Sequence, residues 1–303
     1  MTTFHFAPIQ GHTDAAYRHF HKEFYGNSPQ ITYYTPFIRL EHDEVRQRDS
    51  KDLTSSLNSG MTLVPQIIFR DEQELNALIG ILKRTGCKEI NLNMGCPFPL
   101  QTGHGRGAAT ISSPIMGQAV AEAVSNNPDI TFSLKMRLGL NDPDEWKILL
   151  PFLNDVSLKD ITVHPRIARQ QYTGDLHLNQ FSELIGESVN PVVFNGDIRT
   201  PGDIDRILSE FPKISGIMIG RGLLARPSLI EEWTSGHELA PSERKERMLE
   251  FHRTLLSHYN ETLCGESQII SKIKPFWEYA EDEIGRKAWK AIRKAGNIAK
   301  YHS

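Results

Sequence analysis

Short apolar or β-branched runs recur through the first 220 residues of this 303-residue chain, and segments with helically spaced apolar residues separate them. Two such helical segments are Glu72–Arg84 and Ile115–Ser125. Alternating strands and helices indicate a parallel sheet, and eight strands favour a closed (β/α)8 TIM barrel over an open sheet. The predicted strands are Phe4–Ile9, Ile31–Ile38, Thr62–Phe69, Glu89–Asn93, Thr131–Met136, Asp160–His164, Pro191–Asn195 and Gly216–Gly220.

The pattern changes near Pro241, where helices follow one another without strands between them. The predicted helices are Ser242–His258, Ser267–Glu283 and Gly285–Tyr301. We therefore expect an α/β chain with two domains, a barrel over residues 1–238 and a small all-helical C-terminal domain over residues 239–303. Ser113-Pro114 and Thr200-Pro201 have the cap residue and the first-turn proline that are typical of helix starts.

Bulk composition restricts the location of the protein. The three cysteines, Cys87, Cys96 and Cys264, are too few for a disulfide framework and suit a reducing compartment. No leader-like N-terminus and no run of 18 apolar residues is present. These features predict a cytoplasmic protein that does not enter a membrane, and nothing in the sequence points to an obligatory protein partner, so we expect a monomer.

The end of the chain is basic although the net charge of the whole chain is −3. Residues 285–303 contain six Lys and Arg residues and no acidic residue. Four of them, Arg286, Lys290, Arg293 and Lys294, fall on one stripe of a helix. Such a stripe is either a solvated helix face or a ridge that contacts the phosphates of a nucleic acid.

Polar residues stand at the ends of the predicted strands, where a barrel places its reactive groups. Polar side chains inside apolar strands are unfavourable unless they are paired, so packing alone does not explain their repetition at one end. We expect these residues to form one site at the barrel mouth. They are Gln10, Gln66, Asn91, Asn93, Cys96, Lys135, Arg137, His164, Arg166, Asn195, Asp197 and Arg221.

The segment Asn91-Leu-Asn-Met-Gly-Cys-Pro97 is the most specific of these strand ends. Asn91 and Asn93 share one face of an extended segment, and Cys96 follows in a loop shaped by Gly95 and Pro97. An ordinary thiol keeps its proton at neutral pH, so Cys96 could offer a proton to a planar polar group. A buried structural cysteine beside a tight turn is the alternative.

Glycine-rich segments follow the last two predicted strands, at Asn195-Gly-Asp197 and Gly220-Arg-Gly222. Barrels frequently bind a phosphate there, and Arg221 could neutralise its charge. Lys135 lies within a strand and needs an anionic partner if it faces inward. A reduced flavin, anionic at N1–O2, would be such a partner, and a neighbouring carboxylate is the alternative.

Together these motifs resemble the dihydrouridine synthases, flavin-dependent enzymes that reduce uridine in tRNA. The resemblance runs in order from residue 7 to about residue 235 and continues more loosely through the helical end. It rests on Ala7-Pro-Ile-Gln-Gly-His-Thr-Asp14, Asn91–Pro97, Lys135-Met-Arg137, His164-Pro-Arg166 with Tyr172, Asn195-Gly-Asp197 and Gly220-Arg-Gly222. The sequence departs from the family pattern at Ile9, at Ile167 and in the loop Phe98–Thr102, which lacks the usual lysines.

The resemblance implies an FMN-binding barrel followed by a helical RNA-binding domain, with NADPH or NADH as reductant. It implies that Cys96 gives a proton to C5 of an extruded uridine while hydride reaches C6. Asn93 and Arg166 would bind this substrate, and the stripe of Arg286, Lys290, Arg293 and Lys294 would contact tRNA phosphates. The residues implied to bind FMN are Pro8, Ile9, Gln66, Lys135 and His164 around the ring or ribityl chain, and Asn195, Gly196, Asp197, Gly220 and Arg221 around the phosphate.

Three other functions compete with this interpretation. The first is an FMN barrel that reduces a free pyrimidine or an enone, and the second is an RNA-binding relative without catalytic activity. The third, a sugar-phosphate aldolase that uses Lys135, leaves the Asn91–Pro97 segment unexplained.

Overall fold

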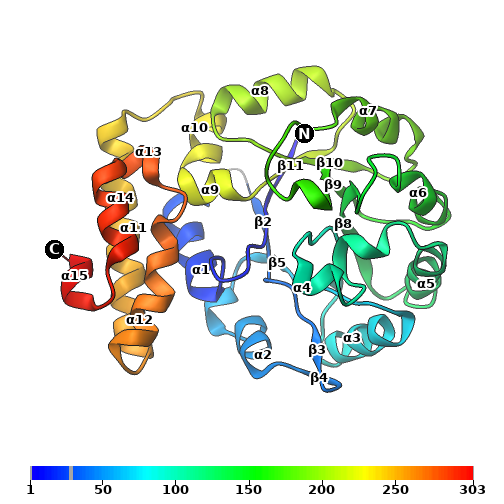
Figure 1. The fold of residues 1–303 in the computed structure, drawn as a ribbon, viewed down its shortest axis with the longest axis horizontal. Helices are drawn as coiled ribbons and strands as arrows, with labels where there is room; N and C mark the ends of the chain where they lie inside the picture. Colours follow the sequence, from blue (N-terminus) through cyan, green and yellow to red (C-terminus); the bar gives the residue numbers. More distant parts are fainter. Residues whose placement is uncertain (1, 27–29, 303) are drawn as a thin grey trace.

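A computed structural model describes residues 2–26 and 30–302 (Figure 1). Its centre is a nine-stranded sheet in which all neighbouring strands are parallel, in the order β5-β2-β1-β11-β10-β9-β8-β7-β6. The strands are β1 (Thr3–Phe6), β2 (Ile31–Tyr34), β5 (Thr62–Val64), β6 (Gln66–Ile67), β7 (Glu89–Met94), β8 (Thr131–Gly139), β9 (Ile161–Ile167), β10 (Val192–Asn195) and β11 (Gly216–Ile219).

Strands β5 and β6 are two parts of one predicted strand, interrupted at Pro65. Proline has no amide hydrogen to give to the sheet, so the regular ladder stops at this residue. The Pro65 carbonyl still accepts a hydrogen bond from the Asn91 amide at 2.9 Å, and β5 pairs with β2 while β6 pairs with β7. The sheet therefore closes on itself, and the predicted (β/α)8 barrel is confirmed.

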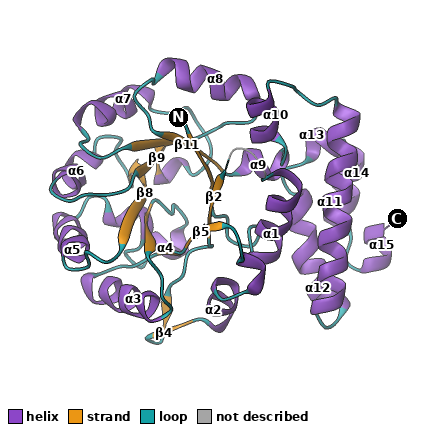
Figure 2. Ribbon diagram, turned by 180° about the vertical axis from the view of Figure 1, so that it is seen from behind, coloured by secondary structure: helices purple, strands orange, loops and turns teal. Residues whose placement is uncertain are grey.

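Helices cover the outside of the barrel (Figures 1 and 2). Ser113 and Thr200 cap α5 and α8 with their side chains, as their sequence positions predicted. The helices that accompany the barrel are α1 (Ala15–Tyr25), α2 (Gln47–Leu53), α3 (Glu72–Arg84), α4 (Pro99–Thr102), α5 (Pro114–Ser125), α6 (Trp146–Asn154), α7 (Leu178–Glu187), α8 (Pro201–Glu210), α9 (Arg221–Ala225) and α10 (Leu229–Ser235). A short hairpin, β3 (Leu40–Glu41) and β4 (Glu44–Val45), precedes α2.

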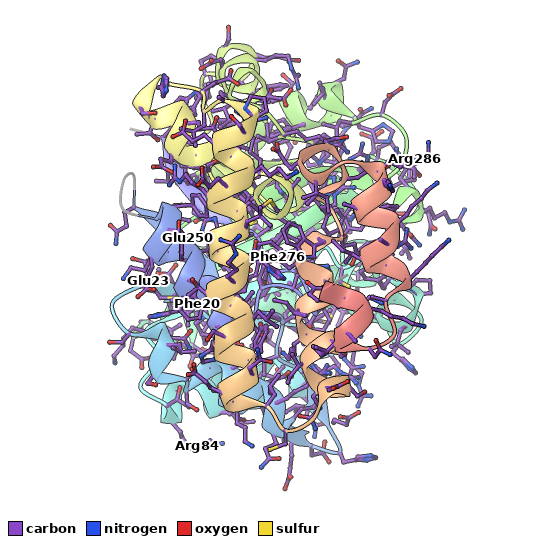
Figure 3. All side chains as sticks on the ribbon, turned by 90° about the vertical axis from the view of Figure 1, so that its left-hand side faces the viewer. Phe20, Glu23, Arg84, Glu250, Phe276 and Arg286 are labelled. Atoms are coloured by element: carbon purple, nitrogen blue, oxygen red, sulfur yellow. The ribbon has the colours of Figure 1, made fainter. Side chains whose placement is uncertain are left out.

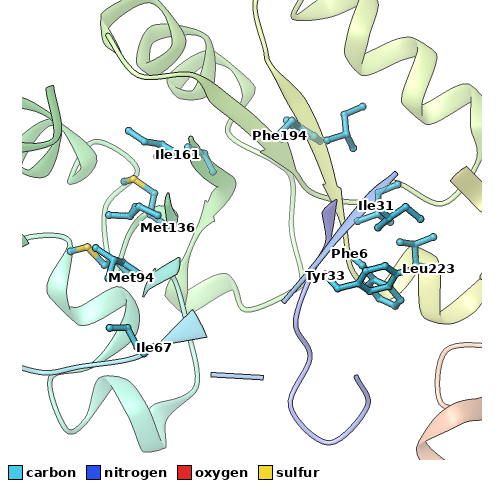
Figure 4. Packing of buried hydrophobic residues seen from close by; sticks show 14 of the residues in the cluster. Phe6, Ile31, Tyr33, Ile67, Met94, Met136, Ile161, Phe194 and Leu223 are labelled. Atoms are coloured by element: carbon cyan, nitrogen blue, oxygen red, sulfur yellow. The ribbon is translucent and has the colours of Figure 1, made fainter. Parts of the chain in front are cut away.

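The main apolar core lies between the barrel strands and their helices. Figure 4 shows Phe6, Tyr33 and Leu223 packed on one side of the barrel, and Met94, Met136 and Ile161 on another. A second, smaller cluster consists of Ala7, Tyr34, Val64, Val193 and Met218. Ala7 and Met218 also line the cavity at the barrel mouth, so this cluster forms an apolar floor beneath it.

After the barrel, the described residues up to 302 form the α-helices α11 (Pro241–Thr262), α12 (Glu266–Ile273), α13 (Glu281–Ile284), α14 (Arg286–Lys294) and α15 (Ile298–His302). The first predicted helix corresponds to α11, whereas the other two predicted helices are broken. Pro275 lies in a tight 3-10 turn after α12, and Ala295 leaves the helical conformation at the end of α14. The backbone of Gly285, at φ +82°, separates α13 from α14.

The helical end packs closely on the barrel. The rings of Tyr17 in α1 and Phe251 in α11 are 5.1 Å apart, and the ring of Phe276 (labelled in Figure 3) lies 5.1 Å from Phe251 and 6.0 Å from Tyr17. These residues belong to the same apolar cluster as the barrel strands, so the predicted domain division at residue 238 stays a prediction. None of the helices within residues 2–26 and 30–302 combines the length and apolar character that a membrane crossing requires.

Candidate active site

One cavity opens at the carboxyl ends of the barrel strands. All the barrel residues that we predicted to bind a cofactor or substrate line it, with the exception of Arg166. They are Pro8, Ile9, Gln66, Asn93, Cys96, Lys135, His164, Asn195, Gly196, Asp197, Gly220 and Arg221. Parallel strands bring their carboxyl ends to the same edge, which is why residues distant in sequence meet there.

A chain of side-chain amides crosses the cavity wall. Asn93 Nδ2 donates to Gln66 Oε1 at 2.7 Å, and Gln66 Nε2 donates to Asn91 Oδ1 at 2.8 Å. Asn91 Nδ2 then donates to Ser133 Oγ at 2.9 Å. Each amide is fixed at both ends and almost fully buried, so the orientation of the Gln66 and Asn93 side chains is set before any ligand arrives.

The Cys96 loop is held by two side chains and is closely backed by a glycine. Asn93 Oδ1 accepts hydrogen bonds from the amides of Gly95 and Cys96, both at 3.0 Å. On the other side, Arg137 Nε donates to the Gly95 carbonyl at 3.1 Å. Behind the loop, Gly107 has φ +61°, and a Cβ added there would lie 2.7 Å from the Cys96 carbonyl oxygen. The loop therefore has one well-defined position against the cavity.

The environment of Cys96 keeps its thiol protonated. Burial raises the pKa of Cys96 above its ordinary value. A hydrogen bond from the Phe98 backbone and the positive charges of Arg137 and Lys135 favour the thiolate, but burial outweighs them. Cys96 lines the cavity and is 8 % exposed. A buried neutral thiol at this place can act as a proton donor, whereas a nucleophilic cysteine would need a lowered pKa.

Lys135 projects into the same cavity as Cys96. Within the described residues, its Nζ forms no hydrogen bond or ion pair, so the predicted alternative of a neighbouring carboxylate is not seen. Burial, together with the positive charge of Arg137, lowers the pKa of Lys135 to about 7. An ammonium group in this position is stabilised by an anionic ligand, which would also raise its pKa again.

His164 is neutral in this site. Burial first, and then the charges of Arg137, Lys135 and other cations, hold its pKa well below the ordinary value. Arg166 Nη1 lies 3.2 Å from His164 Nε2, and a guanidinium can only donate, so Nε2 is the accepting nitrogen. Nδ1 therefore carries the ring proton and remains the donor of His164.

Arg166 lies beneath the cavity surface instead of lining it. Its side chain is buried, with Nη1 donating to Asp197 Oδ1 at 3.0 Å and Nη2 donating to the Gly174 carbonyl at 2.7 Å. Asp197 also accepts from Arg221 Nη2 at 3.0 Å. Burial opposes ionisation of Asp197, but the hydrogen bond and charge of Arg166, with the charge of Arg221, keep the pKa of Asp197 below its ordinary value.

The part of the cavity that follows β10 and β11 is suited to a phosphate. Asn195 Nδ2 bonds the Met218 carbonyl, and Asp197 has the rare φ of +43°, which shapes the turn after β10. A Cβ at Gly222 would lie 2.0 Å from the Ile198 carbonyl oxygen, so glycine is required for α9 to approach this turn. Arg221 begins α9, with its guanidinium 4.4 Å from the centre of the Tyr172 ring.

The cavity also contains residues that the sequence did not assign to the site. The helical end contributes Glu278 and Tyr279, and the barrel contributes His12. His12 Nε2 lies 2.9 Å from Glu278 Oε2, and the His12 and Tyr279 rings are 5.5 Å apart. Arg137 and Tyr172 were visible in the motifs, but the sequence carried no signal for Glu278 or Tyr279.

The predicted basic stripe lies on α14, outside the cavity. Arg286, Lys290, Arg293 and Lys294 are all exposed, and Arg286 extends away from the body of the molecule in Figure 3. Arg286 lies 3.9 Å from Glu281, and the Arg293 guanidinium lies 4.5 Å from the Trp289 ring centre. The stripe is therefore accessible from solvent, and its contact with RNA stays a prediction.

Comparison with solved structures supports the fold. The chain aligns with morphinone reductase at a TM-score of 0.52 and 13% identity, covering 80% of this chain and 88% of that one. The old yellow enzyme from Trypanosoma cruzi aligns with a TM-score of 0.54 and 9% identity, covering 78% of this chain and 89% of that one. At these identities the likeness concerns the barrel architecture alone.

Comparison with protein sequences is more specific. A probable tRNA-dihydrouridine synthase 2 from Bacillus subtilis is 28% identical over 84% of this chain and 78% of that protein. The tRNA-dihydrouridine synthase B from Shewanella oneidensis is 26% identical over 84% of this chain and 80% of that protein. The model of the dihydrouridine synthase family matches residues 5–297. Together with the geometry of the barrel mouth, this match shows that the chain belongs to the dihydrouridine synthase family.

Proposed function

We propose that this protein reduces uridine in tRNA to 5,6-dihydrouridine, using FMN and a nicotinamide reductant, NADPH or NADH. The observation that carries the proposal is the pair of Cys96 and Lys135 in one cavity. A buried neutral thiol faces the same space as an ammonium group that has no protein anion among the described residues. The family and the names of the relatives support this reaction.

The cavity residues fit FMN. Lys135 would hold the anionic N1–O2 edge of the reduced ring, and His164 Nδ1–H would donate to the ring or the ribityl chain. Gln66 retains one amide hydrogen beyond its bond to Asn91, and the backbone at Pro8 and Ile9 would lie against the ring. The phosphate would be surrounded by Asn195, Gly196, Asp197, Gly220 and Arg221, with Arg221 supplying the positive charge. Bound reduced FMN supplies the hydride that is added at C6 of uracil.

Cys96 completes the reduction by giving its proton to C5. Hydride addition at C6 places negative charge toward C5 and O4, and a positioned acid lowers the barrier by capturing that charge. Asn93 already uses its oxygen to hold the Cys96 loop, so its remaining amide hydrogen would orient the uracil. Fixing the loop and the base through one side chain keeps the proton donor aligned with its target.

The substrate must enter as an extruded base, because C5 and C6 are inaccessible in a stacked strand. Arg286, Lys290, Arg293 and Lys294 would contact the phosphates without reading the sequence. Given its contacts with Asp197 and Gly174, Arg166 would serve by orienting Asp197 and Arg221. Cytoplasmic location and a monomeric state stay predictions.

An assay with unmodified tRNA tests the proposal. The purified protein should release FMN on heating, and with NADPH it should form dihydrouridine detectable by mass spectrometry of the digested RNA. RNA from cells that lack the protein should lose a dihydrouridine at a defined position. Release of no flavin, together with no uptake of added FMN, would contradict the cofactor, and unchanged RNA modification in the deletion strain would contradict the substrate.

A further inference from the structure

A second hollow lies on the helical end of the chain, between the α12 region and α14. Its lining combines aromatic and basic residues with apolar and other polar ones: Lys274, Trp277, Tyr279, Trp289 and Arg293, together with Ile270, Ser271, Pro275, Glu278 and Ile292. Its volume, about 580 Å³, falls within the roughly 300–1,000 Å³ of sites that take small molecules. Trp277 is buried, whereas Trp289 is partly exposed and Arg293 is exposed.

The walls of this hollow are fixed by hydrogen bonds. Lys274 Nζ donates to the main-chain carbonyls of Arg293 at 3.0 Å and Ala295 at 2.9 Å, which ties the end of α14 to the turn after α12. Trp289 Nε1 donates to the Glu278 carbonyl at 3.1 Å. The Trp289 ring is therefore held in one orientation, with the Arg293 guanidinium 4.5 Å from its centre.

The hollow and the catalytic cavity share a wall. Glu278 and Tyr279 line both, and the Glu278 carboxylate reaches His12 at the barrel mouth. The hollow also shares Arg293 with the basic stripe on α14. The hollow therefore adjoins both the catalytic cavity and the basic stripe, the two places where we propose that the tRNA is held.

We propose that this hollow binds a second unstacked nucleobase of the tRNA substrate, stacked on Trp289, while the target uridine occupies the catalytic cavity. Aromatic rings beside cationic side chains are the combination that single-stranded nucleic acids use, because every base offers a flat face. The Lys and Arg residues of 285–303, with no acidic residue among them, favour a polyanion as occupant. The inference rests on the proposed function and adds a second contact point on the RNA.

Two substitutions of Trp289 separate the loss of base stacking from the loss of the hydrogen bond that fixes the ring. Trp289→Phe and Trp289→Leu both lose the Nε1 donor to Glu278, but only the first keeps an aromatic face. We expect Trp289→Leu to bind bulk tRNA between about fivefold and about 150-fold more weakly than Trp289→Phe, the range that stacking of one base spans. The log–log salt slope should stay the same in both, because the lost contact carries no charge. In steady-state kinetics, KM should rise and kcat should change little.

A third variant addresses the hollow from its other wall. Ser271→Trp, on exposed α12 surface, fills the space without changing α14 and should weaken tRNA binding in the same way. FMN content is the check on folding for every variant. Equal tRNA affinity of the Leu and Phe variants, or a loss of affinity accompanied by a flatter salt slope, would overturn the proposal. Failure of wild-type protein to form dihydrouridine concerns the proposed function instead, since the binding comparison remains measurable.

Discussion

The barrel mouth and the basic face of α14 are built in opposite ways. At the mouth, the side-chain amides of Asn93, Gln66 and Asn91 are buried, and hydrogen bonds fix each of them at both ends. On α14 the cations are exposed and make few contacts, such as the 3.9 Å approach of Arg286 to Glu281. The barrel mouth therefore fixes the positions of individual atoms, whereas the face of α14 provides only a positively charged surface.

This difference matches the two tasks that we propose. Proton transfer to one carbon atom depends strongly on geometry, so its groups must be held before the substrate arrives. A phosphate backbone can be held by mobile cations, because the attraction does not require one exact arrangement. Substitutions at the mouth should therefore change catalytic rate, whereas substitutions on α14 should change RNA affinity.

The largest effect should come from Cys96→Ser. A serine hydroxyl is a much weaker acid than a thiol, so uridine reduction should fall by roughly 10²–10⁴-fold, the usual contribution of a general acid. Flavin reduction by the nicotinamide and tRNA affinity should remain, and stopped-flow absorbance separates these steps. Cys87→Ser is the control, because that thiol bonds the Glu89 carbonyl away from the cavity. Wild-type turnover by Cys96→Ser would move the acid to another residue.

A smaller loss of rate should follow Gly107→Ala, which touches neither ligand. The new Cβ would lie 2.7 Å from the Cys96 carbonyl oxygen, so the loop must move. Displacing a catalytic group by about 1 Å reduces rate by roughly 10²-fold. Gly105→Ala is the matched control, since Gly105 also has a positive φ, of +71°, but its Cβ would approach Arg70 to only 3.9 Å. Equal rates in the two variants would show that the loop position is unimportant.

Much of this mouth was predictable because it follows from topology. Once the chain is a parallel barrel, the strand ends must meet, and residues such as Gln66, Lys135 and Asp197 fall there by their position in the sequence. The outcome for Arg166 was not predictable in the same way. The direction of the Arg166 side chain depends on its hydrogen bonds to the Gly174 carbonyl and the Asp197 carboxylate. Sequence patterns do not show which neighbour a long side chain will bond.

The contribution of the helical end was beyond sequence reasoning for a related reason. Glu278 and Tyr279 reach the cavity because α11 and the turn after α12 pack on α1 through Tyr17, Phe251 and Phe276. Such packing between distant segments has no local signature, unlike the alternation that predicted the barrel. The break of a predicted helix at Pro275 has a local cause, but where the chain turns afterwards is again set by packing.

The pH dependence of the two half-reactions provides a further contrast. The acid form of Cys96 is the active one, and burial raises the pKa of this thiol above its ordinary value. Uridine reduction should therefore stay level through neutral pH and fall about tenfold per pH unit once the pH exceeds that raised pKa. Flavin reduction by the nicotinamide should lack this fall. If the rate of uridine reduction already fell with rising pH before pH 8 was reached, while flavin reduction stayed unchanged, the pKa of the Cys96 thiol would be lowered and not raised.

On α14, the expected effect is on affinity and its dependence on salt. Replacing Arg286, Lys290, Arg293 and Lys294 with Gln should reduce the log–log salt slope of tRNA binding by about 0.7–0.9 for each lost phosphate contact. FMN content and flavin reduction should be unchanged. The control replaces four exposed cations around the barrel with Gln, namely Arg84, Lys147, Arg206 and Lys213. Equal slopes for the two fourfold variants would make the stripe an ordinary solvated face.

The smallest effect concerns stability at Arg286, the first residue of α14. A positive charge there opposes the helix dipole, and the first turn of α14 contains no acidic residue. Arg286→Glu should therefore gain about 0.3–1 kcal/mol from the helix dipole, more than it loses by facing Glu281, because an exposed pair at 3.9 Å contributes little, and it should weaken tRNA binding. Thermal unfolding, with Lys290→Glu in the middle of the same helix as control, measures the first change, and filter binding measures the second. A loss of stability in Arg286→Glu would mean that Arg286 supports the fold. A gain in stability together with weaker tRNA binding would show that this cation is kept for its ligand.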